Sequence, residues 1–397
     1  MWLKIEVDVN SRLKISWGGT GGIYHYYYVG DKGIEDAAAD VRTQLESLSR
    51  WGRSADPAQR RAWLVALAGA GSSLRYRLVN DVANKAAIRS LEQRLAEDYD
   101  AGDHVLSIQV DSSVHVPWGL AFDSDVPPVV PPVVPAVGAP TVKSQKDPLS
   151  QEIEDFGGFW SLKYRLSATS SGYLGPRSKM KRARKTFGLL SLVNSDVQKQ
   201  IESDLEQPEA YRTFCNLLSP PVGVANSLAE CNALIAKTEQ VDVLFHFLGH
   251  HDGKVLDLGD GQKIDYDAFS RLLDSLTGRF EQRGVSPCGL LFLNGCESAL
   301  GDKDFSLRAQ AARPELCGAI ATEAKVRRAY AAKFGYRFLN AMVNEGMTVA
   351  DVMDGLHHDA ALWPESLLYG CYANPDYGIE KLAGSQQSPD AKPTGNA

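Results

Sequence analysis

Two residue types that perform acyl-transfer chemistry follow two apolar segments of this chain. Residues 241–248 precede His250, and residues 289–293 precede Cys296. Long apolar runs are typical of strands buried on both faces of a parallel sheet. Because the working groups of open α/β sheets lie at the carboxyl ends of the strands, Cys296 is a candidate nucleophile and His250 a candidate base.

The spacing of these two residues corresponds to one crossover unit. The 46 residues from one to the other, 296 − 250, leave room for a hairpin, a helix and a return strand. Neighbouring strands lie about 4.8 Å apart, so a Cys–His contact is expected if the two strands pair. Imidazole would accept the thiol proton, and the thiolate would attack a carbonyl carbon. The backbone N–H groups of Cys296 and His251 are the candidates for stabilising the oxyanion.

A metal site is the alternative explanation for the polar cluster His246, His250, His251 and Asp252. On a strand, residues four apart are separated by roughly 13 Å, at about 3.3 Å per residue, which is too far for one zinc ion. We therefore expect neither a metal nor a cofactor. His246, inside the apolar run, is expected to be a hydrogen-bonded core histidine.

The cysteines are scattered, without the paired spacing of a zinc site or a dense disulfide framework. We expect them to be reduced and the protein to be cytoplasmic. Free cysteines are usually small buried hydrophobes, and this interpretation is kept for all but Cys296. The five that keep it are Cys215, Cys231, Cys288, Cys317 and Cys371.

Composition excludes some functions. The chain has 397 residues, of which 44% are hydrophobic and 23% charged, and its net charge is −7. This charge argues against direct nucleic-acid binding, which needs a dominant basic face. No apolar run approaches the roughly 20 residues that span a bilayer, so no membrane association is expected.

The elements that would position the two residues follow a regular order. From Ser195 onward, helical and strand patterns alternate, which predicts an α/β fold with a parallel sheet. Before that point we expect three strands, at residues 2–9, 12–17 and 23–29. We expect helices to follow at residues 34–50, 57–79 and 80–99. We predict a lead-in unit, a main domain and a disordered tail, at residues 1–70, 71–383 and 384–397.

Two stretches interrupt this order. Residues 126–150 are rich in Pro and Val and are expected to form a loop. Residues 177–185, from Arg177 to Lys185, form a basic segment, which we expect to be a solvated loop. A docking patch for an acidic partner and an exposed cleavage site are the alternatives for this segment.

Several segments resemble CHAT domains, the caspase-like peptidases of clan CD. They are His-Phe-Leu-Gly-His at 246–250, Leu-Phe-Leu-Asn-Gly-Cys-Glu-Ser at 291–298 and Cys-Gly-Ala-Ile-Ala-Thr-Glu at 317–323. The resemblance implies a caspase-like three-layer sandwich, with a mostly parallel central sheet and helices on both faces. It also implies that His250 is the catalytic histidine and Cys296 the nucleophile.

The sequence departs from the family pattern directly after the histidine. The family usually has glycine there, and this chain has His251. A side chain at this position could crowd the substrate or prevent a backbone conformation that glycine alone adopts easily. His251 could also be the working base in place of His250.

The resemblance implies a protein substrate, and three acids bear on its selection. Asp252, Glu297 and Glu323 lie near the expected strand ends and favour a basic or uncharged P1 residue, although each could instead be a helix cap or a structural acid. The expected function is a cysteine endopeptidase in prokaryotic antiviral defence or regulated proteolysis, activated in trans by a sensor protein. The alternative is a CHAT-like scaffold or protein-binding module without activity.

Overall fold

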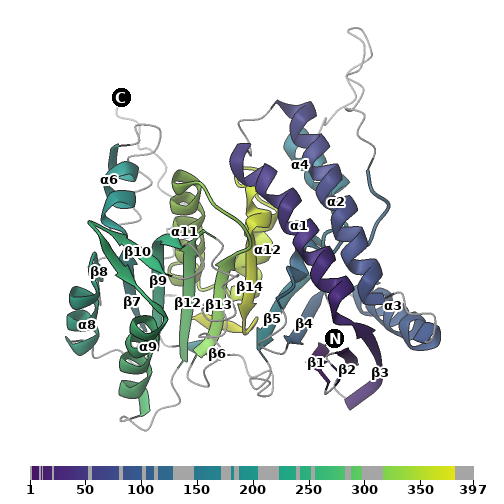
Figure 1. Cartoon of the computed structure of the whole chain (residues 1–397), viewed down its shortest axis with the longest axis horizontal. Helices are drawn as coiled ribbons and strands as arrows, with labels where there is room; N and C mark the ends of the chain where they lie inside the picture. The colour runs from purple at the N-terminus through teal and green to yellow at the C-terminus, as the bar shows by residue number, and fades with distance from the viewer. Residues whose placement is uncertain are drawn as a thin grey trace, which may run out of the picture.

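The computed structural model contains two helix-covered sheets side by side (Figure 1). It describes residues 2–8, 10, 12–19, 22–51, 56–79, 84–100, 104–110, 115–127, 147–170, 180–182, 187–203, 223–237, 242–251, 255–281, 288–296 and 316–380. Most of the Pro-rich stretch and the expected tail lie outside these residues.

The smaller sheet has the order β3-β2-β1-β4-β5. Its strands are β1 (Trp2–Val7), β2 (Arg12–Gly19), β3 (Gly22–Gly30), β4 (Val105–Val110) and β5 (Arg165–Ser170). The first three strands pair antiparallel, whereas β1, β4 and β5 pair parallel. The apolar and charged residues of β1 alternate, so Leu3 and Ile5 are buried while Lys4 faces outward.

Three long helices accompany this sheet: α1 (Asp31–Trp51), α2 (Pro57–Val79) and α3 (Lys85–Asp100). The first two lie across it in Figure 1. Tyr27 of β3 donates its hydroxyl to the carbonyl of Leu78 at 2.7 Å, which ties the end of α2 to the sheet. The helices predicted from periodicity are confirmed here, with ends that differ by a few residues.

Within the described residues, the larger sheet has eight strands. Its main strands are β8 (Gly223–Ala225), β7 (Phe187–Val193), β9 (Asp242–His251), β12 (Cys288–Gly295), β13 (Leu316–Thr322) and β14 (Tyr369–Ala373). The neighbours from β8 to β13 pair parallel in that order. A hairpin of β10 (Leu256–Gly259) and β11 (Gln262–Ile264) is attached to the end of β9.

The α/β class is confirmed, but the expected mostly parallel sheet is corrected to mixed sheets. The hairpin is antiparallel because its turn at Asp260 and Gly261 is too short for a crossover. Strand β14 is antiparallel to β13 because two helices separate them. They return the chain to the end of the sheet at which β13 stops, so β14 runs in the opposite direction. These helices are α11 (Arg328–Val343) and α12 (Val349–His357).

Helices cover both faces of the larger sheet. The register pairs Phe245 with Leu291 and His246 with Phe292. Phe245 and Phe292 therefore point to opposite faces of the sheet. The Phe245 ring contacts Phe269 of α9 (Tyr266–Glu281), with 6.2 Å between centroids. The Phe292 ring contacts Phe338 of α11, at 4.7 Å. Two further helices of this half are α6 (Ser195–Ser203) and α8 (Leu228–Lys237).

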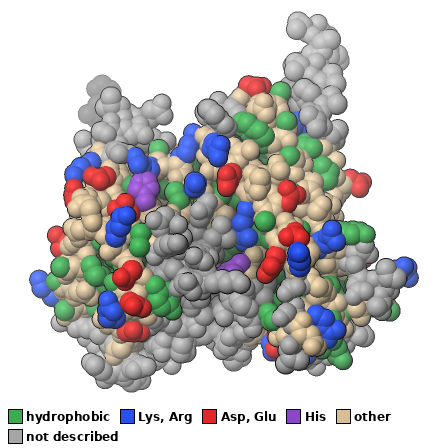
Figure 2. Space-filling view, viewed as in Figure 1, with side chains coloured by type: hydrophobic (Ala, Val, Ile, Leu, Met, Phe, Trp, Pro, Cys, Tyr) green, Lys and Arg blue, Asp and Glu red, His purple; other side chains and the backbone are tan. Residues whose placement is uncertain are grey.

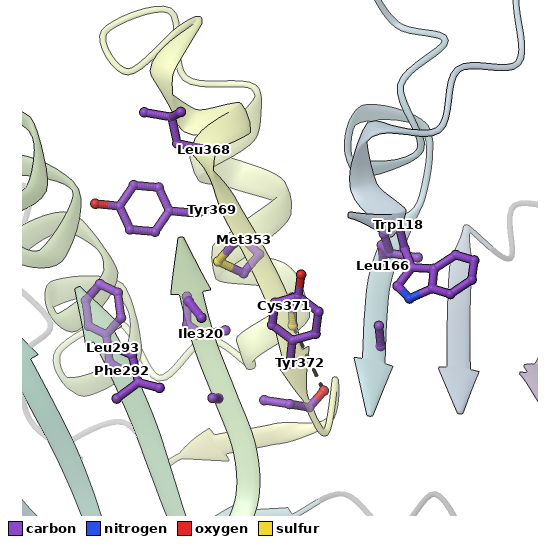
Figure 3. Packing of buried hydrophobic residues seen from close by; sticks show 14 of the residues in the cluster. Trp118, Leu166, Phe292, Leu293, Ile320, Met353, Leu368, Tyr369, Cys371 and Tyr372 are labelled. Carbon is purple, nitrogen blue, oxygen red and sulfur yellow. Dashed lines mark hydrogen bonds between the residues drawn. The ribbon is translucent and has the colours of Figure 1, made fainter. Parts of the chain in front are cut away.

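The two sheets meet at β14 and β5, where Ser167 donates its hydroxyl to the carbonyl of Ala373. Figure 3 shows the apolar core continuing across this junction, from Tyr372 and Cys371 on β14 toward Leu166 and Trp118. The short elements around it are the 3-10 helices Trp118–Leu120 and Glu365–Leu368 and the helices α4 (Pro148–Asp155) and α5 (Trp160–Lys163).

The basic segment 177–185 is not wholly a loop. Its residues Met180–Arg182 form strand β6, which pairs parallel with β15 (Tyr377–Ile379). The other residues of this segment lie outside the described part of the chain. Backbone pairing with a distant strand, which a charge pattern does not reveal, accounts for the difference.

Within the described residues, we find no helix with the length and hydropathy needed to cross a membrane.

Candidate functional site

The register of β9 and β12 brings the two candidate residues together. Gly249 pairs with Gly295 in the parallel ladder, so His250 and Cys296 occupy the next level. Side chains alternate along a strand, which places both residues on the face of Phe292, the face covered by α11. The predicted strand adjacency is confirmed. His250 and His251 are not beyond β9, however, but are its last residues, because β10 pairs with them and prolongs the strand.

The glycines before the two residues are required by packing. A Cβ on Gly249 would approach Phe247 Cζ to 2.8 Å, and a Cβ on Gly295 would approach Phe247 Cε1 to 3.0 Å. The Phe247 ring therefore occupies the space beside both backbones. Any side chain here would push against a buried ring and displace the strand ends that carry the site.

His250 and Cys296 line one cavity of about 300 Å³. Both side chains are half-buried. The other lining residues come from the end of β9, the β10–β11 hairpin and the segment before α11: His251, Val255, Asp257, Lys263 and Lys325. In Figure 2 histidine side chains lie at the surface beside lysine and arginine side chains, where Figure 1 has β10 and α11. The cavity is thus open to a ligand.

In this conformation the thiol and the imidazole bond to other groups. The Cys296 thiol donates to the carbonyl of Val326, with 3.8 Å between sulfur and oxygen. Nη2 of Arg328 donates to Nε2 of His250 at 3.0 Å. Because arginine has no acceptor, Nε2 accepts and the proton of neutral His250 lies on Nδ1. The hydrogen bonds within the described residues do not include one between Cys296 and His250.

His251 supports the backbone of Cys296. This residue is 5% exposed, and its Nδ1 lies 3.3 Å from the carbonyl oxygen of Cys296. A carbonyl accepts only, so Nδ1 carries the proton and donates. Among the described residues, the one non-glycine with positive φ is Asp260. His251 therefore lies in ordinary extended backbone, which does not require glycine.

The segment 323–328 follows β13 and ends with the first residue of α11. It supplies both groups that contact the candidate pair, and it is held from several sides. Arg42 of α1 lies 3.7 Å from the carboxylate of Glu323, and Ser49 of α1 donates to the carbonyl of Lys325. Arg327 pairs with Glu365, which is 1% exposed. Helix α1 is thus bonded to the segment that contacts Cys296 and His250.

Of the three acids predicted to affect specificity, Glu323 is the one that lies within the described residues. Glu323 is 3% exposed, faces Arg42 and is not a lining residue. Asp252 and Glu297 lie outside the described residues. The acid that does line the cavity is Asp257, whose Oδ1 accepts from the backbone of Gly259 at 2.8 Å.

A buried polar network lies beneath the cavity. Asn294 donates to the carbonyl of Ala331 at 2.7 Å and accepts from the hydroxyl of Tyr369 at 2.7 Å. Burial, with a smaller contribution from Cys296, raises the pKa of Tyr369 well above its ordinary value, so this hydroxyl stays a donor. Asn294, two residues before Cys296, thereby connects the end of β12 to α11 and β14.

His246 is the core histidine that the sequence predicts. Its side chain is 0% exposed, and Nδ1 lies 2.8 Å from the hydroxyl of Ser191 on β7. Burial lowers its pKa to about 3, so it stays neutral at physiological pH. Among the described residues, no group of three or more His, Cys, Asp or Glu side chains could hold a metal ion.

The Cys296 side chain is less buried than those of the other described cysteines. Of the four whose side chains the structure describes, Cys231, Cys317 and Cys371 are buried and Cys296 is half-buried. Burial raises the pKa of Cys231 to about 12 and that of Cys371 to about 11. Since the thiolate is the nucleophile, these two thiols are unreactive near neutral pH.

Sequence reasoning missed the cations of this site. Lys263, Lys325 and Arg328 are exposed around the candidate pair. The signal was the run Lys325-Val326-Arg327-Arg328 at the start of a helix, where positive charge opposes the helix dipole. A charge pattern that costs helix stability indicates another role for these residues.

Comparison with protein-family models and comparison with curated proteins both give no match for this chain.

Proposed function

We propose that this protein is a cysteine endopeptidase of the CHAT, caspase-like type, with Cys296 as nucleophile and His250 as base. The observation that carries the proposal is the position of the two residues. They lie at the same level at the ends of two neighbouring parallel strands and on the same face of the sheet. Both line one cavity. The parallel strands with helices on both faces support the caspase-like sandwich.

The proposed reaction has two halves. His250 Nε2 accepts the Cys296 thiol proton, and the sulfur adds to the peptide carbonyl carbon as the C=O electron pair moves to oxygen. The imidazolium then protonates the amide nitrogen while the C–N bond breaks, which leaves a thioester and releases the amine. Water attacks the thioester, His250 takes its proton, and the C–S bond breaks to release the acid and restore the thiol.

The oxyanion would be stabilised by the backbone N–H groups of Cys296 and His251. His251 supports this role because its ring nitrogen Nδ1 donates a hydrogen bond to the carbonyl of Cys296. Positioning by a fixed, buried group preserves the orientation of N–H donors during the reaction. We assign His251 to this positioning and His250 to proton transfer.

Activation in trans is part of the proposal. His250 can accept the thiol proton only after Arg328 leaves Nε2, and the Cys296 thiol must leave the carbonyl of Val326. Both groups belong to the segment that α1 holds through Arg42 and Ser49. A partner or sensor protein that shifts α1 would move this segment and let the pair meet, as expected for regulated proteolysis in prokaryotic defence.

The second candidate is a CHAT-like scaffold without activity. The same two contacts favour it, since a permanent Arg328–His250 contact would keep the base occupied. The two candidates differ in the reactivity of one thiol.

Labelling with a peptide electrophile tests the proposal. The peptidase predicts modification of Cys296, measured by mass spectrometry of the digested protein, and a roughly 10²- to 10⁴-fold lower rate in His250→Ala. His358→Ala is the matched control, because this exposed histidine lies outside the cavity. Equal rates in both variants, or labelling spread over the cysteines, would favour the scaffold.

A further inference from the structure

The cavity is predominantly cationic where the structure describes it. Lys263 and Lys325 line it, and Arg328 lies against His250 at its edge. None of these three cations has a carboxylate partner within ion-pair distance among the described residues, in contrast to Arg327, which pairs with Glu365. Asp257, the acid in the described lining, already accepts a turn hydrogen bond. Cations that outnumber the acids around a cavity favour negative charge in its ligand.

Arg328 differs from the two lysines in what it contacts. It is the first residue of α11, and its guanidinium donates to a neutral imidazole nitrogen. A carboxylate is a far better acceptor for guanidinium than imidazole, because it is charged and accepts two parallel N–H bonds. An acidic side chain that entered the cavity would therefore draw Arg328 away from His250.

We infer that Arg328, with Lys325 and Lys263, forms the subsite for an acidic side chain of the substrate, and that its occupation frees Nε2 of His250 for the Cys296 proton. This inference rests on the proposed peptidase function and specifies its substrate class as peptides with Asp or Glu next to the scissile bond. It replaces the basic or uncharged preference expected from Asp252, Glu297 and Glu323.

The energetic argument is asymmetric between substrates. A neutral side chain at this position would leave Arg328 on His250 and the base occupied. A basic side chain would add repulsion from three cations. An acidic side chain gains charge-assisted hydrogen bonds and also releases the base, so recognition and activation are coupled through one guanidinium.

The test compares matched peptidyl acyloxymethyl ketones that differ at one side chain, namely Asp, Asn and Lys. The rate of Cys296 labelling is measured by mass spectrometry in the full chain. We expect the Asp reagent to label roughly 10- to 100-fold faster than the Asn reagent, and the Lys reagent to be slowest. In Arg328→Glu the Asp preference should disappear or reverse, and Lys325→Glu should weaken it. Arg271→Glu, an exposed cation of α9 outside the cavity, should change nothing.

A second probe separates recognition from structural damage. Iodoacetamide alkylates the thiol without any peptide side chain. In Arg328→Ala the Asp reagent should label more slowly, whereas iodoacetamide should react with Cys296 at least as fast as in the unmodified chain. A parallel fall for both probes would mean that Arg328 only maintains the fold, which would overturn the inference.

The outcomes distinguish this inference from the proposed function. Labelling of Cys296 that needs His250 but ignores the reagent's charge overturns the acidic subsite alone. A preference for the Lys reagent overturns it as well and favours the expectation based on Asp252 and Glu297. If no reagent labels Cys296 in a His250-dependent way, the peptidase function fails, and the subsite fails with it.

Discussion

His246 and His250 lie four residues apart on one face of β9, and their surroundings differ completely. His246 is fully buried and bonded to Ser191, and burial lowers its pKa to about 3. His250 is half-buried, lines the cavity and contacts Arg328. The chemistry available to a histidine on this strand therefore depends on how far α11 extends above it.

Helix α11 sets that limit. A Cβ on Gly335 would lie 3.7 Å from Nε2 of His246, so the middle of the helix covers this histidine. Arg328 starts the helix and lies beside His250. Seven residues of helix and four residues of strand both span roughly 10–13 Å, so the helix start coincides with the strand end. One histidine is consequently a structural group and the other a candidate base.

The largest expected effect separates the two histidines by their phenotypes. His250→Ala should lower the rate of Cys296 labelling roughly 10²- to 10⁴-fold and change the free energy of unfolding by no more than about 0.5 kcal/mol. His246→Ala should lower that free energy by roughly 2–4 kcal/mol, because it opens a cavity and removes the partner of Ser191. Urea unfolding and labelling rates measure both. A stability loss in His250→Ala equal to that in His246→Ala would contradict the comparison.

The pH dependence of the free energy of unfolding is a second test of the burial of His246. The folded pKa of His246 is about 3, against 6.5 ordinarily, and burial lowers that of His357 to about 4. Between these values and 6.5 the unfolded chain binds protons that the folded chain does not, so stability is full above about pH 6.5 and falls as the pH falls. Each histidine should contribute to the free energy of unfolding a slope that approaches about 1.4 kcal/mol per pH unit, the value for one proton bound by the unfolded chain alone.

The matched variant for this slope is His246→Asn, which has no titrating group. Urea unfolding of the unmodified chain and of the variant, at intervals from pH 7 to pH 5, gives the slope for each. The variant should be less stable at pH 7 but should lose less stability toward pH 5. Parallel curves would show that His246 is protonated in the folded state.

The smallest effect concerns the hydrogen-bond network of Asn294, two residues before Cys296. Tyr369→Phe removes the hydroxyl that donates to Asn294 but keeps the ring stacked on Phe334 at 3.7 Å between centroids. We expect a loss of about 1 kcal/mol in the free energy of unfolding, from one buried hydrogen bond. Asn294→Ala should cost more, because it also leaves the carbonyl of Ala331 without its donor. Thermal unfolding of both variants tests this order, and equal losses would contradict it.

Much of the fold followed from periodicity. The apolar run of β9 and that of β12 are long and unbroken, so burial on both faces and parallel pairing could be predicted without coordinates. The antiparallel β14 could not, because strand direction depends on the path of α11 and α12 and not on the strand's own residues. The same holds for β6, whose partner β15 lies far along the chain.

For the site, the sequence by itself determined that His250 and Cys296 each follow a buried apolar run and that one crossover unit separates them. The reason is that strand alternation and the crossover length are local properties. Only the tertiary structure decided which groups meet them: Val326 at the thiol, Arg328 at the imidazole and α1 behind both. These contacts join elements far apart in sequence, and no local pattern encodes them. The structure also places Lys263, Lys325 and Arg328 around the pair and sets Glu323 against Arg42, away from the cavity lining.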